Sequence, residues 1–583
     1  MEEVIRTEIK KLIQEVIEQA QKSGKLPVFD IPDIQIVSPP VELQDSADYS
    51  TNIALVLSRI ISKTPIEIAS TLSDIIMSSN KKLMLIEQRH DRGFGMKVLN
   101  PGFINFILPW DVFCEELEKI LEQKENYGKS DLGQNKKAQV EFISANPTGP
   151  LTLGNGRGGF YGDVLANILA KTGFDVEREY YVNDVGEQIK KLGHSILDDE
   201  QAVYRGEYIS DLRDKLDSRL RGNDKKDGGN GKRESGNDNH DAEKIGKQAA
   251  EIIMQEMIMP TIEKKMKIKF DGYFNENSLY EDGKVDEIID YLKEKKLAYE
   301  QEGALWFKST QFGDEKDRVL IKADGEKTYL ASDIAYLKNK FERKFNKLVY
   351  IWGADHHGYV GRIKAAASAL GYNSDDIEII IMQLVRLMSG GKEIRMSKRA
   401  GTYIALDELL DEISLDVARF FFLMYSPDTH MNFDLDLAKE HSQKNPVYYV
   451  QYAYARMHSI FKKSDKPPRL PPLSRGGLRG DELRLNDPNI LKLLEHENEL
   501  KLIKQLIKFP EIIEDIAKDY QVHRLPHYAL DLVRQFHKFY EKCRVIDERN
   551  PDLTEARLAL VGATQIVLKN VLDLMGISAP EKM

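Results

Sequence analysis

The hydrophobic positions at the start of the chain recur at spacings of three and four residues, which predicts an amphipathic helix that Gly24 ends. The apolar face of this helix consists of Val4, Ile5, Ile9, Leu12, Ile13, Val16 and Ile17. Apolar runs at 34–37, 83–86 and 103–108 predict strands, and helices are expected from Ser50 to Ile61 and after Pro65. Residues 1–110 are therefore expected to form a small α+β domain.

From about residue 136, strand-like and helix-like patterns alternate. The run 138–144 is followed by a glycine-rich loop, by a helix expected to begin near Gly156, and by a second strand-like run at 176–182. Strand, loop, helix and strand in this order form the unit from which parallel sheets are built. Runs at 348–352 and 379–382 are expected to extend the same sheet.

From Leu415 to the end, the pattern is helical and punctuated by prolines, so an all-helical C-terminal domain is expected. Two stretches interrupt the globular pattern. Residues 221–240 contain no hydrophobic side chain, and residues 462–481 are rich in proline and glycine. The first is expected to be a disordered insertion and the second a flexible one, because neither buries enough apolar surface to order itself.

The composition narrows the class of protein. Of the 583 residues, 42% are hydrophobic and 30% are charged, which is typical of chains that bury cores. The net charge of −11 argues against a uniformly basic nucleic-acid coat or a polybasic membrane binder, although a local basic face stays compatible with it. No apolar run approaches the roughly 20 residues of a bilayer span, and the first residues are too polar for a signal peptide. The chain contains only two cysteines, Cys114 and Cys543, so we expect neither a disulfide framework nor a cysteine zinc site. Such low cysteine usage fits a reducing compartment, and we expect a cytoplasmic protein.

The loop 145–156 carries the first candidate chemistry. Its glycines allow close backbone approach, and the following helix offers free N–H groups to a phosphate. The loop lacks the Gly-Lys-Ser/Thr ending of a P-loop, and it is too long for a dinucleotide fingerprint. A nucleotide site and an ordinary turn between strand and helix both stay open at this point.

A second candidate element is the segment 390–401, which reads GGKEIRMSKRAG. Four cations lie within eight residues of it, namely Lys392, Arg395, Lys398 and Arg399. Positive charges on a glycine-flanked loop suit the charge that develops on a triphosphate during displacement. A solvated basic turn would be the simpler interpretation if this loop stood alone.

Taken in order, the two elements resemble the HIGH and KMSKS motifs of class I aminoacyl-tRNA synthetases, with LTLGN at 151–155 and RMSKR at 395–399. The chain is identified as similar to the arginyl-tRNA synthetase family within that class. Further matching segments lie at 50–54, 102–106, 183–188 and 576–583. The resemblance implies a multidomain α/β protein with an N-terminal tRNA-contacting domain over 1–110, a Rossmann-type parallel-sheet catalytic domain over 111–410, and a helical anticodon-binding domain over 411–583.

In that family, the substrate arginine is held by four residues that correspond to Glu141, Asn146, Tyr329 and Asp333 of this chain. A guanidinium is planar and permanently charged, so carboxylates recognise it best in bidentate geometry. If a helix begins at Tyr329, the four-residue spacing places Tyr329 and Asp333 on one face. Without the resemblance, Glu141 and Asp333 would read as ordinary surface carboxylates.

The HIGH-like segment departs from the family pattern, because Thr152 and Asn155 replace its two histidines. A hydroxyl and an amide still donate hydrogen bonds to ATP phosphates but carry no positive charge, so Lys398 is expected to supply the missing charge. These three residues are the expected catalytic groups. The resemblance implies an ATP site that also includes Pro150, Gly154, Gly156, Gly353, Asp355, His356, Met396 and Ser397. Mg²⁺ is expected to arrive with ATP, and no metal site is expected in the protein itself.

The resemblance also suggests where tRNA is contacted. Candidate contacts are Asn52, Phe103 and Asn105 in the N-terminal domain, and Tyr448, Gln451, Arg456 and Tyr540 in the helical domain. Aromatic, amide and guanidinium groups stack on and hydrogen-bond unpaired bases. Packing in a core is the alternative interpretation for each tyrosine, and it is the one expected for Tyr449 and Tyr452.

The expected activity is the ATP-dependent attachment of L-arginine to its tRNA, by a monomer with no membrane partner. Two alternatives stay open. Loss of both motif histidines is compatible with a catalytically impaired paralogue that binds tRNA, and another class I synthetase, such as the cysteinyl enzyme, is a near relative. The scarcity of cysteines argues against the cysteinyl enzyme, which builds a zinc site from them.

Overall fold

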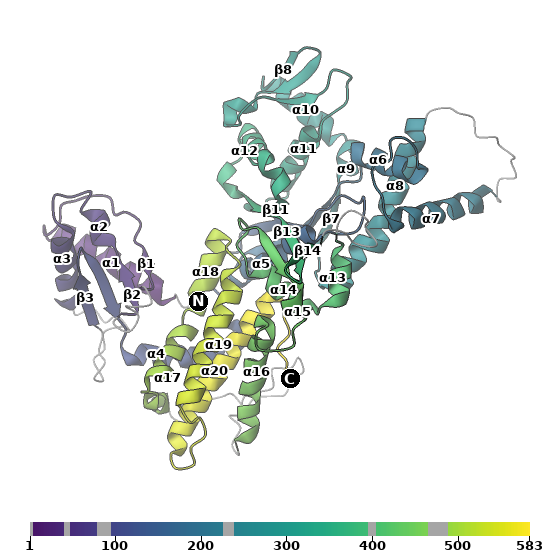
Figure 1. Cartoon of the computed structure of the whole chain (residues 1–583). Helices are drawn as coiled ribbons and strands as arrows, with labels where there is room; N and C mark the ends of the chain where they lie inside the picture. Colours follow the sequence, from purple (N-terminus) through teal and green to yellow (C-terminus); the bar gives the residue numbers. More distant parts are fainter. Residues whose placement is uncertain (1–3, 40–46, 79–94, 225–237, 395–403, 465–487) are drawn as a thin grey trace.

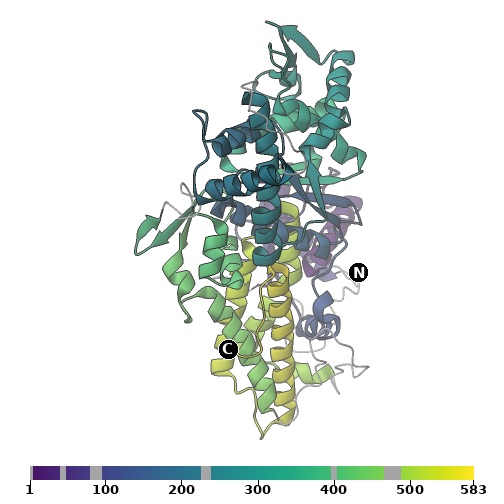
Figure 2. The same cartoon turned by 90° about the vertical axis from the view of Figure 1, so that its right-hand side faces the viewer.

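The structure, a computed structural model of the whole chain, describes residues 4–39, 47–78, 95–224, 238–394, 404–464 and 488–583. Figure 1 shows an N-terminal domain on one arm, an α/β body on the other, and a helical bundle between and below them. The second view places the bundle below the α/β body as well (Figure 2). The expected multidomain α/β architecture is confirmed.

The N-terminal domain is an antiparallel four-stranded sheet in the order β1-β2-β4-β3, packed against helices. The apolar face of the first helix, α1, is buried as the pattern predicts. The elements are α1 (Ile5–Lys22), β1 (Ile36–Val37), β2 (Tyr49–Thr51), α2 (Ile53–Leu57), α3 (Pro65–Ser78), β3 (Gly95–Leu99) and β4 (Phe103–Ile107). The strand expected at 83–86 lies outside the described residues.

The helix expected from Ser50 to Ile61 is wrong at both ends. Ser50 lies in β2, opposite Asn105 of β4, and its hydroxyl donates to Oδ1 of Asn105 at 2.7 Å. The helix α2 begins only at Ile53 and ends at Leu57. Because Ser50 pairs with β4, it does not begin the helix as the local pattern predicted.

The catalytic-type domain is built on a parallel five-stranded sheet in the order β12-β11-β5-β6-β7. Four of these strands were expected from the sequence. The strands are β5 (Lys137–Glu141), β6 (Asp175–Val182), β7 (Gly272–Asn275), β11 (Lys347–Gly353) and β12 (Ile377–Met382), and α5 (Leu153–Lys171) connects β5 to β6. The sequence pattern missed β7, since its four residues are too few to show a strand periodicity.

A second hydrophobic core lies above the sheet, around a three-stranded antiparallel sheet in the order β10-β9-β8 (Figure 1). The strands are β8 (Ala298–Gln301), β9 (Ala304–Phe307) and β10 (Arg318–Ile321), and the helices are α9 (Glu276–Glu281), α10 (Lys284–Glu294), α11 (Tyr329–Glu342) and α12 (Val360–Ala369). The helix α11 belongs to this core and also faces the parallel sheet, since the ammonium of its Lys340 lies 4.0 Å from the ring centroid of Tyr350 in β11.

Three helices project from the α/β body on the side of the first insertion, namely α6 (Glu187–Leu197), α7 (Glu207–Asp224) and α8 (Asp238–Ile253). The expectation of disorder throughout 221–240 is wrong at both ends, because α7 extends to Asp224 and α8 begins at Asp238. The segment between these two helices lies outside the described residues, so disorder there stays a prediction.

The transition to the C-terminal domain contains a third small sheet in the order β14-β13-β15. Its strands are β13 (Val385–Ser389), β14 (Lys392–Ile394) and β15 (Met431–Asp434), and the nearby helices are α13 (Leu406–Glu412), α14 (Leu415–Leu423) and α15 (Leu435–Lys439). The strand β15 contradicts an all-helical domain after Leu415. Met431 and Phe433 alternate with exposed residues, a period of two that is too short here to stand out from the flanking helices.

The rest of the C-terminal part is a helical bundle, as expected. It comprises α16 (Pro446–Lys463), α17 (Glu497–Leu506), α18 (Phe509–Asp519), α19 (Arg524–Lys542) and α20 (Pro551–Met575), and α4 (Trp110–Gln123), from much earlier in the chain, packs against it. The expected flexible insertion at 462–481 falls mainly on residues 465–487, which the structure does not describe. Flexibility there stays a prediction.

Within the described ranges, α20 is the one helix long and apolar enough to cross a membrane. Polar residues such as Gln565 and Lys569 interrupt its apolar positions, so the sequence shows no long unbroken apolar run there. Of its most apolar 18-residue window, 89% is buried inside the protein, the environment of a core helix. Arg419 of α14 ties the end of α20 to the α/β body, because its guanidinium pairs with Asp163 of α5 at 2.8 Å and donates to the carbonyl oxygen of Met575 at 3.1 Å.

Candidate active site

The candidate site lies at the carboxyl edge of the parallel sheet, the usual position of ligand sites in such sheets. Glu141 ends β5 and is in register with Glu179 of β6 and Tyr350 of β11. Side chains in one row of parallel neighbours point to the same face. The helix α11 packs over this face, since Tyr336 donates a hydrogen bond to Oε1 of Glu179.

Glu141 is buried and already has a cationic partner. The Lys340 ammonium lies 2.5 Å from Oε2 of Glu141, and the two side chains are 1% and 6% exposed. The hydroxyl of Ser144 donates to the other carboxylate oxygen at 3.3 Å. One oxygen of Glu141 is therefore committed to Lys340, and the other is bonded only through a long hydrogen bond. The sequence reading missed Lys340, because no recognised motif contains it.

The chain turns sharply just after Glu141. Ile143 and Ser144 adopt φ values of +66° and +37°, in the left-handed region that a β-branched residue such as Ile143 rarely enters. Strained positions of this kind cluster at functional sites. The turn leads to Asn146, whose amide donates to Oε1 of Gln188 at 2.6 Å.

The helix α11 begins at Tyr329, so the condition for Tyr329 and Asp333 to lie on one helix face is met. Its Tyr329 side chain is 38% exposed, and its hydroxyl accepts a hydrogen bond from the backbone N–H of Glu187 at 3.2 Å. Asn146 and Tyr329 thus both contact the segment 186–188, one through Gln188 and the other through Glu187. That segment joins residues from β5 and α11 that are distant in the sequence.

Two carboxyl groups near Glu141 have raised pKa values. Burial, together with the charges of Glu276 and Glu141, raises the pKa of Asp333 to about 8. Burial raises the pKa of Glu276 to about 7, and the charge of Asp184 adds to the shift. Carboxyl groups in this condition are stabilised in their charged form by an added cation. The arrangement therefore suits a positively charged ligand.

Glu276 is a candidate site residue that the sequence reading missed. It follows β7 at the carboxyl edge of the sheet, is 1% exposed, and accepts a hydrogen bond from Ser332 at 2.7 Å. Recognition of β7 as a strand would have indicated it, because the residue after a parallel strand lies at the ligand edge.

The N-terminus of α5 lies at the end of the glycine-rich loop. The helix begins at Leu153, three residues before the expected start near Gly156. Thr152 is its N-cap residue and forms a reciprocal capping box with Asn155. The Thr152 hydroxyl accepts from the N–H of Asn155 at 3.3 Å, and Oδ1 of Asn155 accepts from the N–H and the hydroxyl of Thr152 at 2.9 and 2.8 Å.

This capping box changes what each side chain offers a phosphate. The Thr152 hydroxyl proton is committed to Asn155, so Thr152 acts through the shape of the helix end. The Asn155 amide nitrogen points away from the bonds that its oxygen makes, and the N–H groups of Leu153 and Gly154 have no acceptor within the helix. Together these donors fit an anion at the helix N-terminus.

Two glycines of this loop have different surroundings. Gly154 is exposed, with nothing closer than Oγ1 of Thr152 at 3.5 Å to a Cβ placed on it. Gly156 is buried, and a Cβ there would lie 2.5 Å from a methyl group of Leu406. The N–H of Gly156 donates to the carbonyl oxygen of Thr152. Gly156 therefore packs closely between α5 and α13, and its expected place in the ATP site stays a prediction.

The expected basic loop falls largely on residues 395–403, so Met396, Ser397 and Lys398 lie outside the described residues. Gly353, Asp355 and His356 lie at the exposed end of β11 and in the short helix that follows it. Nε2 of His356 is 3.5 Å from Oδ2 of Asp355. In the part of the chain that the structure describes, no group of three or more His, Cys, Asp or Glu side chains is arranged to hold a metal ion.

The candidate RNA contacts of the helical domain divide into buried and accessible groups. Gln451 is buried, and its amide donates to Oδ2 of Asp416 at 2.8 Å and to Ser578, so its role in the structure is to fix the C-terminal segment. Arg456 is partly exposed, with its guanidinium 5.0 Å from the centroid of the Tyr540 ring.

Three tyrosines of α16 lie in different surroundings. Tyr448 shares a hydrogen bond with Nδ1 of His441 at 2.6 Å. Tyr452 is 38% exposed, so the expectation that it packs in a core is wrong. Tyr449 is partly buried against His537, with ring centroids 5.2 Å apart.

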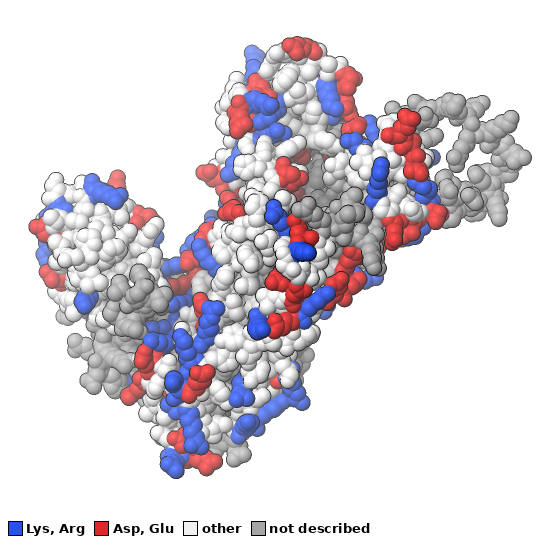
Figure 3. Space-filling model, in the orientation of Figure 1, with Lys and Arg blue, Asp and Glu red and all other residues white. Residues whose placement is uncertain are grey.

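In the N-terminal domain, Phe103 is 38% exposed and Asn52 is partly exposed, whereas Asn105 is 3% exposed. The Asn105 side chain is bonded to Ser50 inside the sheet, so the structure does not present it to a partner. Figure 3 shows Lys and Arg side chains gathered along the bundle, on the side that faces the N-terminal domain. A local basic face therefore exists on a chain whose net charge is −11.

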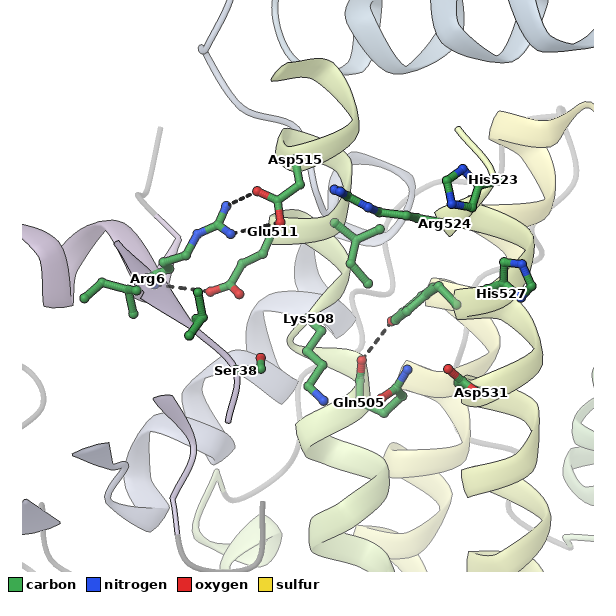
Figure 4. Close-up of a pocket in the computed structure, with 14 residues that line it drawn as sticks. Arg6, Ser38, Gln505, Lys508, Glu511, Asp515, His523, Arg524, His527 and Asp531 are labelled. Atoms are coloured by element: carbon green, nitrogen blue, oxygen red, sulfur yellow. Dashed lines mark hydrogen bonds and ion pairs between the residues drawn. The ribbon is translucent and has the colours of Figure 1, made fainter. Parts of the chain in front are cut away.

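A cavity of about 490 Å³ lies between the N-terminal domain and the bundle (Figure 4). Arg6 spans it, pairing with Asp515 at 2.7 Å and donating its backbone N–H to Glu511 at 3.2 Å. Lys508 and Arg524 line the side formed by the bundle. Its lining contains no residue that the sequence indicated as functional, so the cavity belongs to the joint between the two domains.

Comparisons with known proteins cover almost the whole chain. Residues 7–108 match the family described as the arginyl tRNA synthetase N terminal domain, residues 116–422 the catalytic domain of class I tRNA synthetases (R), and residues 450–583 the DALR anticodon binding domain.

Relatives match at full length. The chain is 41% identical to the arginine–tRNA ligase of Geobacillus kaustophilus over 98% of both chains. It is 39% identical to that of Bacillus subtilis over 100% of this chain and 99% of the relative. The solved arginyl-tRNA synthetase of Thermus thermophilus has a TM-score of 0.73 at 21% identity, covering 99% of this chain and 100% of that one, and it supports the fold.

Proposed function

The chain belongs to the arginyl-tRNA synthetase family, and we propose that it uses ATP to attach L-arginine to tRNA. The observation that carries this proposal is the group of carboxylates at the carboxyl edge of the parallel sheet, in which Glu141 and Glu276 are buried and Asp333 is half-buried. Among the amino-acid side chains, guanidinium is the cation that meets several carboxylates best, because it is planar and permanently charged.

In this proposal, the guanidinium of arginine lies against Asp333 and the oxygen of Glu141 that Lys340 leaves available. Asn146 and Tyr329 frame the ligand from β5 and α11, and Glu276 adds negative charge from the end of β7. The raised pKa of Asp333 supports this assignment, since the substrate would supply the positive charge that the free pocket lacks.

ATP would lie across the N-terminus of α5. The Asn155 amide and the N–H groups of Leu153 and Gly154 would donate to phosphate oxygens, and Lys398 would bring positive charge from the basic loop. Other proposed contacts are Pro150, Gly353, Asp355, His356, Met396 and Ser397. Mg²⁺ would enter with the nucleotide and neutralise part of its charge.

The reaction needs no covalent bond to the protein. A carboxylate oxygen of arginine attacks the α-phosphorus of ATP, the bond to the β-phosphate oxygen breaks, and pyrophosphate leaves. A ribose hydroxyl at the 3′ end of the tRNA then attacks the arginyl carbonyl, and AMP leaves. Catalysis rests on placing the reacting atoms and on stabilising the charge that develops on the phosphates.

The tRNA would bind along the basic side of the bundle, with Tyr448, Arg456 and Tyr540 as contacts, and would reach Asn52 and Phe103 in the N-terminal domain. The accessibility of Arg456, Phe103 and Asn52 supports this placement. An enzyme that supplies charged tRNA to ribosomes acts in the compartment of translation, so we place this protein in the cytoplasm. We further propose that it is a monomer.

The test is a charging assay with each amino acid separately, in the presence of ATP, Mg²⁺ and total tRNA. We expect arginine alone to become attached. Charging with a different amino acid would favour another class I synthetase, and tRNA binding without charging would favour the catalytically impaired paralogue that the loss of both motif histidines left open.

A further inference from the structure

We propose that Lys340 is a positioning residue for arginine binding, which holds Glu141 in one orientation through a buried ion pair. The inference rests on the proposed function and adds a determinant of its amino-acid site. Lys340 does not touch the proposed substrate position itself, because its ammonium binds the oxygen of Glu141 that faces α11.

The Lys340 ammonium is enclosed by groups that hold it in place. Besides Oε2 of Glu141, it faces the Tyr336 ring at 4.3 Å and the Tyr350 ring at 4.0 Å, measured to the ring centroids. Cation–π contacts of this kind offset part of the hydration that a buried ammonium loses. The lysine is therefore fixed from the helix side by Tyr336 and from the sheet side by Tyr350 and Glu141.

The position of Lys340 on α11 links it to the proposed ligand residues. Tyr329, Asp333, Tyr336 and Lys340 follow one another at spacings of four, three and four residues, which places all of them along one face of the helix. The helix α11 thus carries both Asp333 and the lysine that orients Glu141. A shift of α11 would therefore affect both carboxylates that are proposed to bind the guanidinium of arginine.

The charges around the pocket divide into two groups. Lys340 pairs with Glu141, and Arg343 pairs with Glu179 at 2.6 Å. The pKa of Glu179 lies below its usual range, since Lys340, Arg343 and Tyr336 together outweigh the opposing effect of burial. The pKa of Asp333, by contrast, is raised. The cations of the protein itself therefore pair with Glu141 and Glu179, and Asp333 stays available for the substrate.

The direct test compares the variants Lys340→Met and Lys338→Met in steady-state charging. Lys338 lies on the same helix and pairs with Glu342 at the surface at 3.6 Å, so its variant is a matched control for the loss of one lysine. We expect Lys340→Met to raise KM for arginine by about tenfold or more and KM for ATP by less than about threefold. The Lys338→Met variant should change neither.

A double-mutant cycle keeps the proposal testable if Lys340→Met folds poorly, because Glu141→Gln together with Lys340→Met leaves no buried unpaired charge. If Lys340 acts through Glu141, adding Lys340→Met to Glu141→Gln should change KM for arginine by less than about threefold. Additive effects in the cycle, parallel increases in both KM values, or an unchanged KM for arginine would each overturn the proposal. Failure of the wild-type chain to charge arginine would instead overturn the proposed function.

Discussion

Ala405 forms a β-bridge with Thr152, the N-cap residue of α5, and the N–H of Leu406 donates to the carbonyl oxygen of Leu151 at 2.7 Å. The chain just after the basic loop is thereby attached to the start of the helix whose free N–H groups suit a phosphate. The segments that resemble HIGH and KMSKS are far apart in the sequence, and this contact ties the residues that follow the second to the first.

From this attachment we predict that Lys398→Ala lowers kcat for charging by more than about tenfold, since Lys398 would supply the positive charge that Thr152 and Asn155 lack. The melting temperature should stay unchanged. Lys392→Ala, which removes an exposed lysine of the neighbouring β14, is the control and should have little effect. A loss of only a few-fold in Lys398→Ala would contradict the compensation between this lysine and the altered motif.

The capping box gives a prediction for Asn155. In Asn155→Asp, a carboxylate oxygen still accepts the bonds from Thr152 and preserves the helix cap, but a negative charge replaces the amide donor beside the triphosphate. We expect KM for ATP to rise by about tenfold or more with a nearly unchanged melting temperature. Thr152→Ser, which keeps the cap and all of its hydrogen bonds, should retain most activity. Equal kinetics for Asn155→Asp and the wild type would exclude the amide as a phosphate donor.

The raised pKa of Asp333 predicts a pH-dependent affinity for arginine. Burial and the charges of Glu276 and Glu141 raise this pKa to about 8, against the opposing effects of Arg362 and Lys340, so the free pocket holds a proton at neutral pH. Arginine needs the ionised form, and its binding should release that proton. We therefore expect the dissociation constant to fall as the pH rises from about 6.5 to about 8.5, by at most about tenfold per unit.

Calorimetry in two buffers of different ionisation enthalpy measures this proton release directly. The folded protein binds the Asp333 proton more tightly than the unfolded chain does, so this group makes the free protein less stable as the pH rises toward 8. The stabilisation by added arginine should accordingly grow over the same range. An affinity that is constant or decreases with rising pH would contradict the assignment, and Asp333→Asn should remove the pH dependence near pH 8, leaving only that of Glu276 near pH 7.

The sequence predicted the parallel sheet because its signals are local, since strands such as β5 and β11 are apolar runs. The residues Tyr329 and Asp333 on α11 were indicated by the resemblance alone, and their role in arginine binding stays a prediction. The pairing of β2 with β4 and the strand β15 could not be predicted in this way. In both cases, hydrogen bonds to a distant strand decide the conformation of three or four residues whose local pattern is ambiguous.

The site itself was predicted only in part for a similar reason. Glu141 and Asp333 were indicated by the family resemblance, whereas Glu276 and Lys340 became visible only once the sheet and α11 were assembled. Conversely, Gly156, Asn105 and Gln451 looked functional in the sequence, but the structure uses them for packing or internal hydrogen bonds. A polar or small residue in a motif does not reveal from sequence alone which of its neighbours it faces.

Arg456 and Gln451 provide a matched pair for the RNA surface. Arg456→Ala removes an accessible guanidinium stacked near Tyr540 and should raise KM for tRNA by about threefold to tenfold, with KM for arginine unchanged. Gln451→Ala removes buried bonds to Asp416 and Ser578 and should lower stability by about 1–3 kcal/mol, with a smaller effect on KM for tRNA. The reverse pattern would show that the RNA face lies elsewhere on the bundle.

The charging of tRNA with arginine and, separately, with citrulline tests the central claim most directly. Citrulline has nearly the shape of arginine but carries an uncharged urea group in place of the guanidinium. If the buried carboxylates select a cation, the purified chain with ATP, Mg²⁺ and tRNA should attach arginine and should reject citrulline by a factor of about a hundred or more. Comparable charging with both amino acids, or no arginine attached by a folded sample, would contradict the account.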